Sequence, residues 1–535
     1  MHAPFLYDFY ALKGADIPAW HASFSWPVAR ETTTKLMIDF VAAYTALVDE
    51  LSHTPEGDVA LAGILVPGLF VQAVNHYLAV ETLRRQGRTI VHSDRLVLVP
   101  QFLRPHEPMR FAPARLPEAP AGGMAKRRLK HWVYSLHYNR QRLAKALDHF
   151  DLSRSVVAFD SGAVLERPFT RSLPGWARVF SPSEWHGARG QAAPGTLAAL
   201  RGVAADYTRF AAAYSRDELG VELPPTLTLA LETYARETLE DLASGYQGLL
   251  DIFARIKPAH LLTPTAGNPF TRTASLAARR RGARVTGFPH GYYISHYSSP
   301  RPAFHELATV DEFVAYTPGS VPLLERNLAL NPTPRGNPVR FVNENYPHLR
   351  ETFDTWRDRP IPERIRTVMV FELSLLPEWA GYHCADVMTN YHFYYSLCSQ
   401  LTRAGYRVVF KKRPKGPMWD GVNIFKDIPG LKVETRPLET PGVIDQVDAV
   451  VIQYAMSSTL HWSMCTNKTV VYVDSGWEPW FPDVRADMER RCRVLPCAYD
   501  AANRPCYHEQ DALDVLQRAP EQPDPLYVEK YLSPA

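Results

Sequence analysis

Residues 447–474, "VDAVVIQYAMSSTLHWSMCTNKTVVYVD", contain three apolar runs separated by short polar segments. The first run, "AVVI", predicts a buried strand, and Ser457-Ser458-Thr459 predicts the start of a helix. "TVVYVD" then predicts a second strand. Strand, helix and strand in succession are typical of a parallel sheet with crossover helices. This stretch therefore predicts an α/β fold.

The same alternation occurs on both sides of a boundary near 340–365. From residue 258 onward, "PAHLLTP", "ARVTGFP" and "DEFVAYT" predict strands, with helices predicted at "TRTASLAARRRG" and "GSVPLLERN". From 366 onward, "RTVMVFELS", "YRVVFKKRP" and "LKVET" predict a second series, with a helix at "YYSLCSQLTRAG". We therefore expect two Rossmann-like, doubly wound domains that face a central cleft, with ligands at the carboxyl ends of the strands.

The first half of the chain is less regular. Residues 58–70, "DVALAGILVPGLF", predict a buried strand, 71–87 a helix, and 88–93 a second strand. The proline- and alanine-rich residues 101–123 predict a linker or long loop. Residues 195–257 have helical periodicity throughout. We therefore expect a helical insertion, at about 124–257, in the N-terminal domain.

The overall composition limits the classes of function. The chain has 535 residues, 46% hydrophobic and 21% charged, with a formal net charge of +3, so it does not resemble a nucleic-acid-binding protein. Neither a signal peptide nor an apolar run of about 20 residues is visible, and we expect a cytoplasmic protein. The basic helix predicted at 126–145 either contacts an anionic membrane surface or is simply solvated.

The cysteines suggest reduced thiols. All six lie in the last third of the chain, and none forms a C-x-x-C pair. A metal site made by Cys492, Cys497, Cys506 and His508 is an alternative, but this spacing matches no common zinc pattern.

Two clusters could bind phosphate. Lys411, Lys412 and Arg413 follow a predicted strand, and we expect them at its carboxyl end; the alternative is a solvated turn. The Ser457-Ser458-Thr459 turn places hydroxyls at a helix N-terminus, where a phosphate fits; the alternative is a simple N-cap. Glu372, near the end of "RTVMVFELS", is a further candidate for binding the same ligand.

Two residues could take part in catalysis. Asp160 follows the apolar run in "SVVAFDSGAVLERPF" (155–169) and could accept a proton from a hydroxyl, or it could merely cap a turn. His290 lies in "VTGFPHGYYISHYSS" (285–299), after another predicted strand. Gly291 permits a tight turn there, so we expect His290 to face the cleft, where it shapes the cleft or does chemistry.

The "PHG" loop, the "GNP" at 336–338 and the Ser-Ser-Thr turn resemble the GT-B glycosyltransferases. The order of motifs is similar to bacterial sialyltransferases and capsular Kdo transferases, which use CMP-activated acidic sugars. Asp160-Ser161-Gly162 corresponds to their acidic-acidic-Gly motif at its first and last positions. Arg413-Pro414 stands where His-Pro is expected, and Ser457-Ser458 matches the last motif. His290-Gly291 resembles a Gln-His-Gly loop, with Pro289 in place of Gln.

The resemblance implies a metal-independent glycosyltransferase that moves Kdo or another nonulosonic acid from a CMP donor to a hydroxyl of a bacterial surface glycan or glycoprotein. Asp160 is then the base or nucleophile, and the donor, a substrate rather than a cofactor, is held by these residues: Glu372, Lys411, Lys412, Arg413, Ser457, Ser458 and Thr459. Residues 1–350 form the acceptor domain, 351–510 the nucleotide-sugar domain and 511–535 a tail. We expect the enzyme to work in the cytoplasm, and contact to the inner membrane through 126–145 stays open against a solvated helix.

Two alternatives stay open. In a CDP-alditol phosphotransferase, His290 is the natural base and Asp160 is dispensable. A catalytically silent GT-B homologue, acting as a binding or scaffold subunit in polysaccharide assembly, is the other alternative; the arginine at the His-Pro position and the basic helix are compatible with it.

Overall fold

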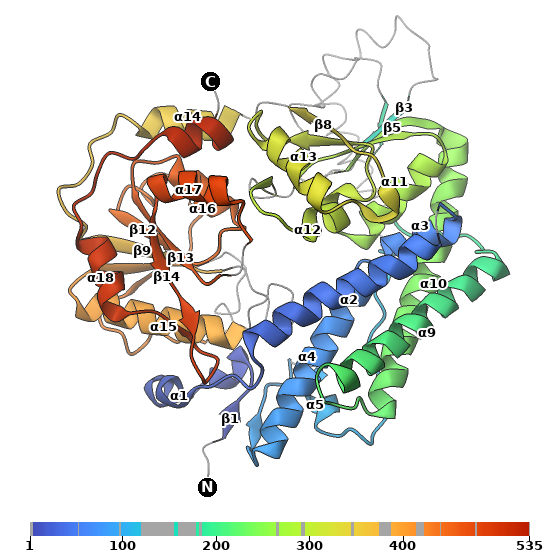
Figure 1. Cartoon of the computed structure of the whole chain (residues 1–535), viewed down its shortest axis with the longest axis horizontal. Coiled ribbons are helices and arrows are strands. Elements are labelled where there is room, and N and C mark those ends of the chain that lie inside the picture. Colours follow the sequence, from blue (N-terminus) through green and yellow to red (C-terminus); the bar gives the residue numbers. More distant parts are fainter. Residues whose placement is uncertain are drawn as a thin grey trace, which may run out of the picture.

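The structure is a computed structural model of the chain. It describes residues 4–51, 53–95, 98–118, 155–158, 178–180, 185–263, 267–289, 291, 295–343, 347–373, 387–412, 422–438, 440–476 and 479–533. Figure 1 shows three parts: a sheet domain in yellow and green, a sheet domain in orange and red, and a group of blue and green helices beneath the first.

The first sheet has six parallel strands in the order β4-β3-β5-β6-β7-β8. Its strands are β3 (Ser155–Ala158), β4 (Arg178–Phe180), β5 (Pro258–Thr263), β6 (Arg284–Gly287), β7 (Glu312–Ala315) and β8 (Arg340–Asn343). Between them lie α11 (Pro269–Arg280), α12 (Pro300–Pro302), η4 (Ala303–Leu307), α13 (Ser320–Leu330) and η5 (Pro334–Gly336). The strands and helices predicted from residue 258 to the boundary are confirmed.

The second sheet is also parallel, in the order β11-β10-β9-β12-β13-β14. Its strands are β9 (Thr367–Phe371), β10 (Arg407–Lys411), β11 (Lys432–Glu434), β12 (Ala449–Ile452), β13 (Thr469–Asp474) and β14 (Arg493–Pro496). Its helices are α14 (Pro347–Trp356), α15 (Val387–Arg403), α16 (Ser458–Met464), α17 (Pro482–Arg491) and α18 (Glu509–Gln517). The predicted second series is confirmed, and the change of sheet falls between Asn343 and Thr367.

The helices beneath the first sheet are α2 (Arg30–Glu50), α3 (Pro55–Ala62), α4 (Leu65–Arg85), α5 (Leu98–Phe102), α9 (Pro194–Asp217) and α10 (Pro225–Ile256). The helical prediction for 195–257 is confirmed, and residues 103–118 contain no helix or strand. The predicted insertion is not helical throughout, because β3 and β4 fall inside it.

The strand predicted at 58–70 is wrong. These residues form most of α3 and the start of α4, and a short apolar run does not distinguish a buried strand from a buried helix. Pro67 lies in the first turn of α4, where proline is tolerated. The strand predicted at 88–93 shrinks to β2 (Ile90–Val91), which pairs with β1 (Phe5–Leu6) in a separate two-stranded sheet. The predicted β-α-β unit therefore does not exist.

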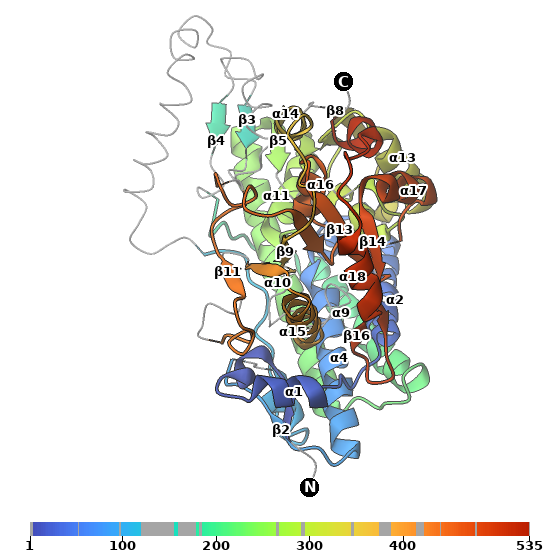
Figure 2. The same ribbon diagram turned by 90° about the vertical axis from the view of Figure 1, so that its left-hand side faces the viewer.

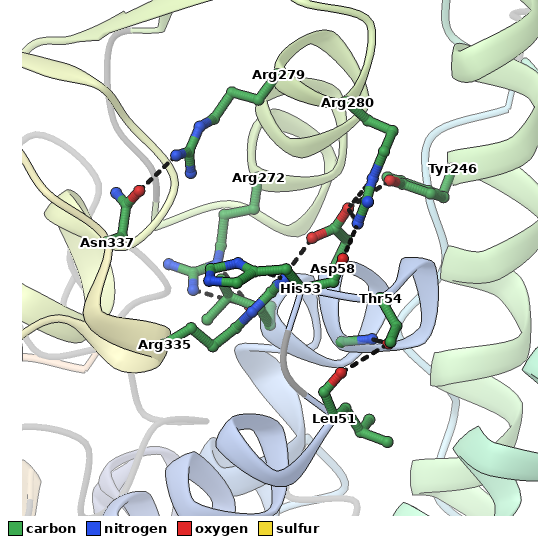
Figure 3. A network of polar contacts seen from close by, with 12 residues as sticks. Leu51, His53, Thr54, Asp58, Tyr246, Arg272, Arg279, Arg280, Arg335 and Asn337 are labelled. Carbon is green, nitrogen blue, oxygen red and sulfur yellow. Dashed lines mark hydrogen bonds and ion pairs between the residues drawn. The ribbon is translucent and has the colours of Figure 1, made fainter.

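A buried ionic network ties α3 to the first sheet domain (Figure 3). The Asp58 carboxylate accepts hydrogen bonds from Arg280 Nη2 at 2.7 Å, Arg335 Nη1 at 2.8 Å and the Tyr246 hydroxyl at 2.6 Å. Asp58 and Arg335 side chains are both buried. Every bond to the carboxylate in this network comes from the chain itself.

The N-terminal segment packs on the second sheet domain, although α2 belongs to the helices beneath the first (Figures 1 and 2). Around η1 (Phe9–Leu12) and α1 (Ile17–Ser23), the rings of Phe9 and Tyr391 lie 4.3 Å apart, and those of His21 and His392 lie 4.2 Å apart. Arg30, the first residue of α2, donates to the carbonyls of Ser475 and Gly476 at 2.6 and 2.5 Å.

The end of the chain makes the opposite crossing. After the small hairpin β15 (Ala498–Tyr499) and β16 (Pro505–Cys506), η7 (Val528–Leu532) reaches the first sheet domain. There the Thr317 hydroxyl donates to the carbonyl of Tyr531 at 2.6 Å. Each terminal segment thus also contacts the domain that is farther from it in sequence.

Among the described helices, none alone is long and apolar enough to cross a membrane. The pair α3 and α4, bent by 45° relative to each other, passes such a test together by length and composition. The basic segment 126–145 lies outside the described residues.

Candidate functional site

The two strand orders locate the places where ligands bind in such sheets. In the second sheet, the chain runs from β9 through β10 to β11 on one side, and then returns to β12 on the other side of β9. In the first, the direction changes between β3 and β5. Ligands of doubly wound sheets bind beyond the carboxyl ends of the strands at such switch points.

The two carboxyl edges face each other. Tyr297, in the loop after β6, forms an antiparallel bridge with Trp480, in the loop after β13. The backbone N–H of Ser298 donates to the carbonyl of Pro479 at 2.8 Å, and the backbone N–H of Phe481 donates to the carbonyl of His296 at 3.3 Å. The two candidate edges therefore meet through these loops.

Three polar side chains form a row at the carboxyl edge of the second sheet, and we call Lys412, Glu372 and Gln453 the polar row. The register pairs Lys411 with Phe371, and Val451 with Val370. Continuing it places Lys412 beside Glu372, and Glu372 beside Gln453, on adjacent strands about 4.8 Å apart. By the alternation of side chains along strands, all three belong to the face covered by α15.

Contacts with α15 fix the centre of the row. The Tyr391 hydroxyl donates to Glu372 Oε1, and the backbone N–H of Leu373 donates to the Tyr394 hydroxyl at 2.6 Å. Burial, together with the neighbouring Glu372 charge, raises the pKa of Tyr391 well above its usual value. Tyr391 therefore stays protonated and keeps its hydrogen bond to the carboxylate.

The lysines at the end of β10 are buried. Exposed fractions are 6% for Lys411 and 5% for Lys412, so the alternative of a solvated turn is wrong for both. Lys411 Nζ donates to the carbonyl of Lys412 at 2.9 Å, and the backbone N–H of Lys412 donates to the backbone carbonyl of Glu434 at 2.9 Å. Two cationic side chains thus lie at the carboxyl edge, as predicted, on opposite faces of the sheet.

The Ser-Ser-Thr turn has the predicted strand–turn–helix geometry. Ser457 is the N-cap of α16, and its hydroxyl accepts a hydrogen bond from the Thr459 N–H at 3.1 Å. Its carbonyl is 2.9 Å from His461 Nδ1. Ser458 and Thr459 are half-buried. Ser457 therefore caps α16, while Ser458 and Thr459 have no assigned capping role, and phosphate binding by the three residues stays a prediction.

Three predicted site residues lie outside the described residues: Asp160, His290 and Arg413. In sequence, Asp160 follows the end of β3 by two residues, and His290 follows the end of β6 by three. Arg413 follows Lys412 directly. Their roles stay predictions.

Sequence reasoning missed Gln453 and His461. Gln453 has an exposed fraction of 3%, and neither Nε2 nor Oε1 has a hydrogen-bond partner in the described part of the chain. In the sequence, Gln453 is marked only as a polar residue directly after the apolar run "AVVI". His461 is fully buried 4.7 Å from the ring of His296, and burial lowers the pKa of His461 to about 4. The sequence marks His461 still less clearly, because it is a single histidine in a predicted apolar helix.

No group of three or more His, Cys, Asp or Glu side chains that could hold a metal ion occurs among the described residues. Four of the five cysteines described are buried, and all five are free: Cys398, Cys465, Cys492, Cys497 and Cys506. The alternative metal site at Cys492, Cys497, Cys506 and His508 does not form such a group in this part of the chain.

No family model matches the chain, and no curated protein matches it. Among solved structures, it is similar to UDP-N-acetylglucosamine 2-epimerase from Rickettsia bellii, at 11% identity and a TM-score of 0.38, over 70% of this chain and 92% of that one. It is also similar to the UDP-GlcNAc 2-epimerase of Neisseria meningitidis bound to UDP-GlcNAc, at 12% identity and a TM-score of 0.33, over 68% of this chain and 89% of that one. A glycosyltransferase from Rickettsia africae ESF-5 is similar at 9% identity and a TM-score of 0.30, over 66% of this chain and 86% of that one.

The assignment of architecture comes from the sheets themselves. Two parallel, doubly wound sheets, joined near residue 350 and meeting at their carboxyl edges, form the GT-B architecture. The expected fold class is confirmed.

Proposed function

We propose that this protein is a glycosyltransferase that moves Kdo or another nonulosonic acid from a CMP donor to a hydroxyl of a bacterial surface glycan or glycoprotein. The observation that carries the proposal is the pair of buried lysines, Lys411 and Lys412, at the carboxyl edge of the second sheet beside its switch point. Buried cations at this edge suit a phosphate-bearing ligand. The motif resemblance supplies the CMP donor and the acidic sugar.

The reaction needs a base and a site that stabilises the leaving group. The acceptor oxygen forms a bond to the anomeric carbon, the bond from that carbon to the phosphate oxygen breaks, and CMP leaves. Asp160 accepts the proton of the acceptor hydroxyl. Lys412, Arg413 and the Ser458-Thr459 turn hold the phosphate as it gains charge.

Nucleotide binding is the first test. We expect CMP to raise the melting temperature more than CDP, UDP or GDP at equal concentration, because a ligand specific for the native state stabilises it by about 2.7 kcal/mol at a hundredfold excess over Kd. No shift with any of the four nucleotides would instead favour the catalytically silent scaffold.

A transfer assay then separates the two enzymatic readings. We expect Asp160→Asn to abolish transfer from a CMP-sugar, while His290→Ala retains part of it. Full activity in the Asp160 variant, with loss in the His290 variant, would favour the CDP-alditol phosphotransferase. Nucleotide binding by both variants serves as the control for folding.

A further inference from the structure

Gln453 is the most unusual polar residue at the carboxyl edge of the second sheet. It directly follows β12 at the switch point, and both ends of its side-chain amide are buried without a hydrogen-bond partner in the described part of the chain. Leaving a buried donor or acceptor unpaired costs about 1–3 kcal/mol, so such a group needs an explanation.

A second buried glutamine of the same domain shows the ordinary arrangement. Gln400 on α15 is 4% exposed, its Nε2 donates to the carbonyl of Glu509 at 2.7 Å, and its Oε1 accepts from the Tyr507 hydroxyl at 2.6 Å. Both ends of that amide are bonded within the chain. The contrast indicates that Gln453 serves a partner from outside the chain.

The neighbours of Gln453 restrict what that partner can be. A side-chain amide presents one donor end and one acceptor end, and Glu372, next to it in the polar row, adds a carboxylate that only accepts. The Tyr391 hydroxyl donates to one oxygen of that carboxylate, and a carboxylate can accept about four hydrogen bonds. A ligand group that matches both side chains therefore has one hydrogen-bond acceptor and two hydrogens to donate, all on the same edge.

Resting on the proposed function, we propose that Gln453 and Glu372 recognise the cytosine base of the donor nucleotide. Gln453 Nε2 donates to N3 of cytosine, Gln453 Oε1 accepts one hydrogen of the 4-amino group, and Glu372 accepts the other. Uracil presents an oxygen in place of that amino group, and this oxygen faces the Glu372 carboxylate. The pair therefore selects cytosine over uracil.

Isothermal titration with CMP and UMP, which differ only in the base, tests the pair. We expect the wild type to bind CMP at least about tenfold more tightly than UMP, and Gln453→Met to weaken CMP binding by about tenfold to hundredfold. Gln400→Met, the same change at the bonded glutamine, leaves CMP affinity within about twofold.

Melting temperatures without nucleotide provide an independent readout. Gln453→Met removes an unpaired amide and raises the melting temperature, whereas Gln400→Met breaks two hydrogen bonds and lowers it. A fall in Gln453→Met equal to that in Gln400→Met would show that the amide is already bonded, for example by buried water, and would overturn the inference.

Glu372→Gln tests the selectivity separately. An amide can donate to the uracil oxygen, so the preference for CMP over UMP falls to about threefold or less. An unchanged preference in this variant, or unchanged CMP affinity in Gln453→Met, refutes the inference and leaves the proposed function standing. A wild type that binds none of CMP, CDP, UDP and GDP refutes both.

Discussion

The Asp58 network and the polar row both bury polar side chains, yet they differ in how the hydrogen-bonding groups of those side chains are satisfied. Asp58 accepts hydrogen bonds from Arg280, Arg335 and Tyr246, all supplied by the chain (Figure 3). In the polar row, both ends of the Gln453 amide lack a partner in the described part of the chain. A closed network of this kind holds elements together, whereas an open one at a switch point has the properties of a binding site.

Breaking the closed network should produce the largest effect on stability. Asp58→Ala leaves Arg335 and part of Arg280 as uncompensated buried charge, so we expect the free energy of unfolding to fall by about 3–5 kcal/mol. Urea denaturation measures this change. Asp354→Ala, which removes an exposed partner of Arg350, should cost less than about 1 kcal/mol.

Nucleotide affinity should be independent of the Asp58 network. At a temperature where Asp58→Ala is folded, its CMP affinity should equal that of the wild type, because the network lies away from the second sheet. A variant that remains stable but loses CMP binding would contradict the division into a structural and a binding region.

Acid should destabilise the protein through two buried histidines, one on a helix beneath the first sheet and one on a helix of the second sheet domain. Burial lowers the pKa of His76, on α4, and of His461, on α16, from the usual 6.5 to about 4. Because the unfolded chain binds these protons first, stability is complete above pH 6.5 and is lost as the pH falls from 6.5 toward 4, on the order of 3 kcal/mol for each residue.

Unfolding free energies between pH 4 and 7 measure this dependence. His461→Gln should show a shallower decline than the wild type, and His76→Gln should show a similar change. A pH dependence identical in all three proteins would mean that neither buried histidine titrates in this window.

Removing one cation tests the open region. Lys412→Met should weaken CMP binding by about tenfold to hundredfold, since hydrogen bonds to charged groups contribute about 1.5–3 kcal/mol. Titration calorimetry measures the change. The matched control is Lys432→Met, at the exposed start of β11, which should keep the affinity of the wild type.

The smallest effect is expected at the turn. Ser457→Ala removes the cap of α16 and should lower the free energy of unfolding by about 1 kcal/mol. Ser458→Ala should cost less than about 0.5 kcal/mol and, as a proposed phosphate ligand, should weaken CMP binding. If only the Ser457 variant loses affinity, the capping residue rather than Ser458 contacts the donor.

The sequence predicts the two sheets well because their strands alternate regularly with helices and end on polar residues. Apolar runs bounded by turn residues or charges mark four of these strands: β9, β10, β12 and β13. The strand prediction for residues 58–70 failed because packing against the surrounding helices, and not the apolar run itself, decides that α3 and α4 are helical. Lys411 and Lys412 were found from their place after a strand. Gln453 was not, because burial and a missing partner are properties of the folded chain.

The anchoring of the N-terminal segment has a consequence for biosynthesis. Arg30 contacts Ser475 and Gly476, 445 and 446 residues further along the chain. The first 30 residues therefore leave the ribosome long before the strands that bury them exist, so the two halves cannot be completed one after the other. At about 5–20 residues per second, aromatic side chains such as Phe9 and Trp26 stay without their final neighbours for tens of seconds. A chaperone that binds apolar segments is well suited to protect them during that interval.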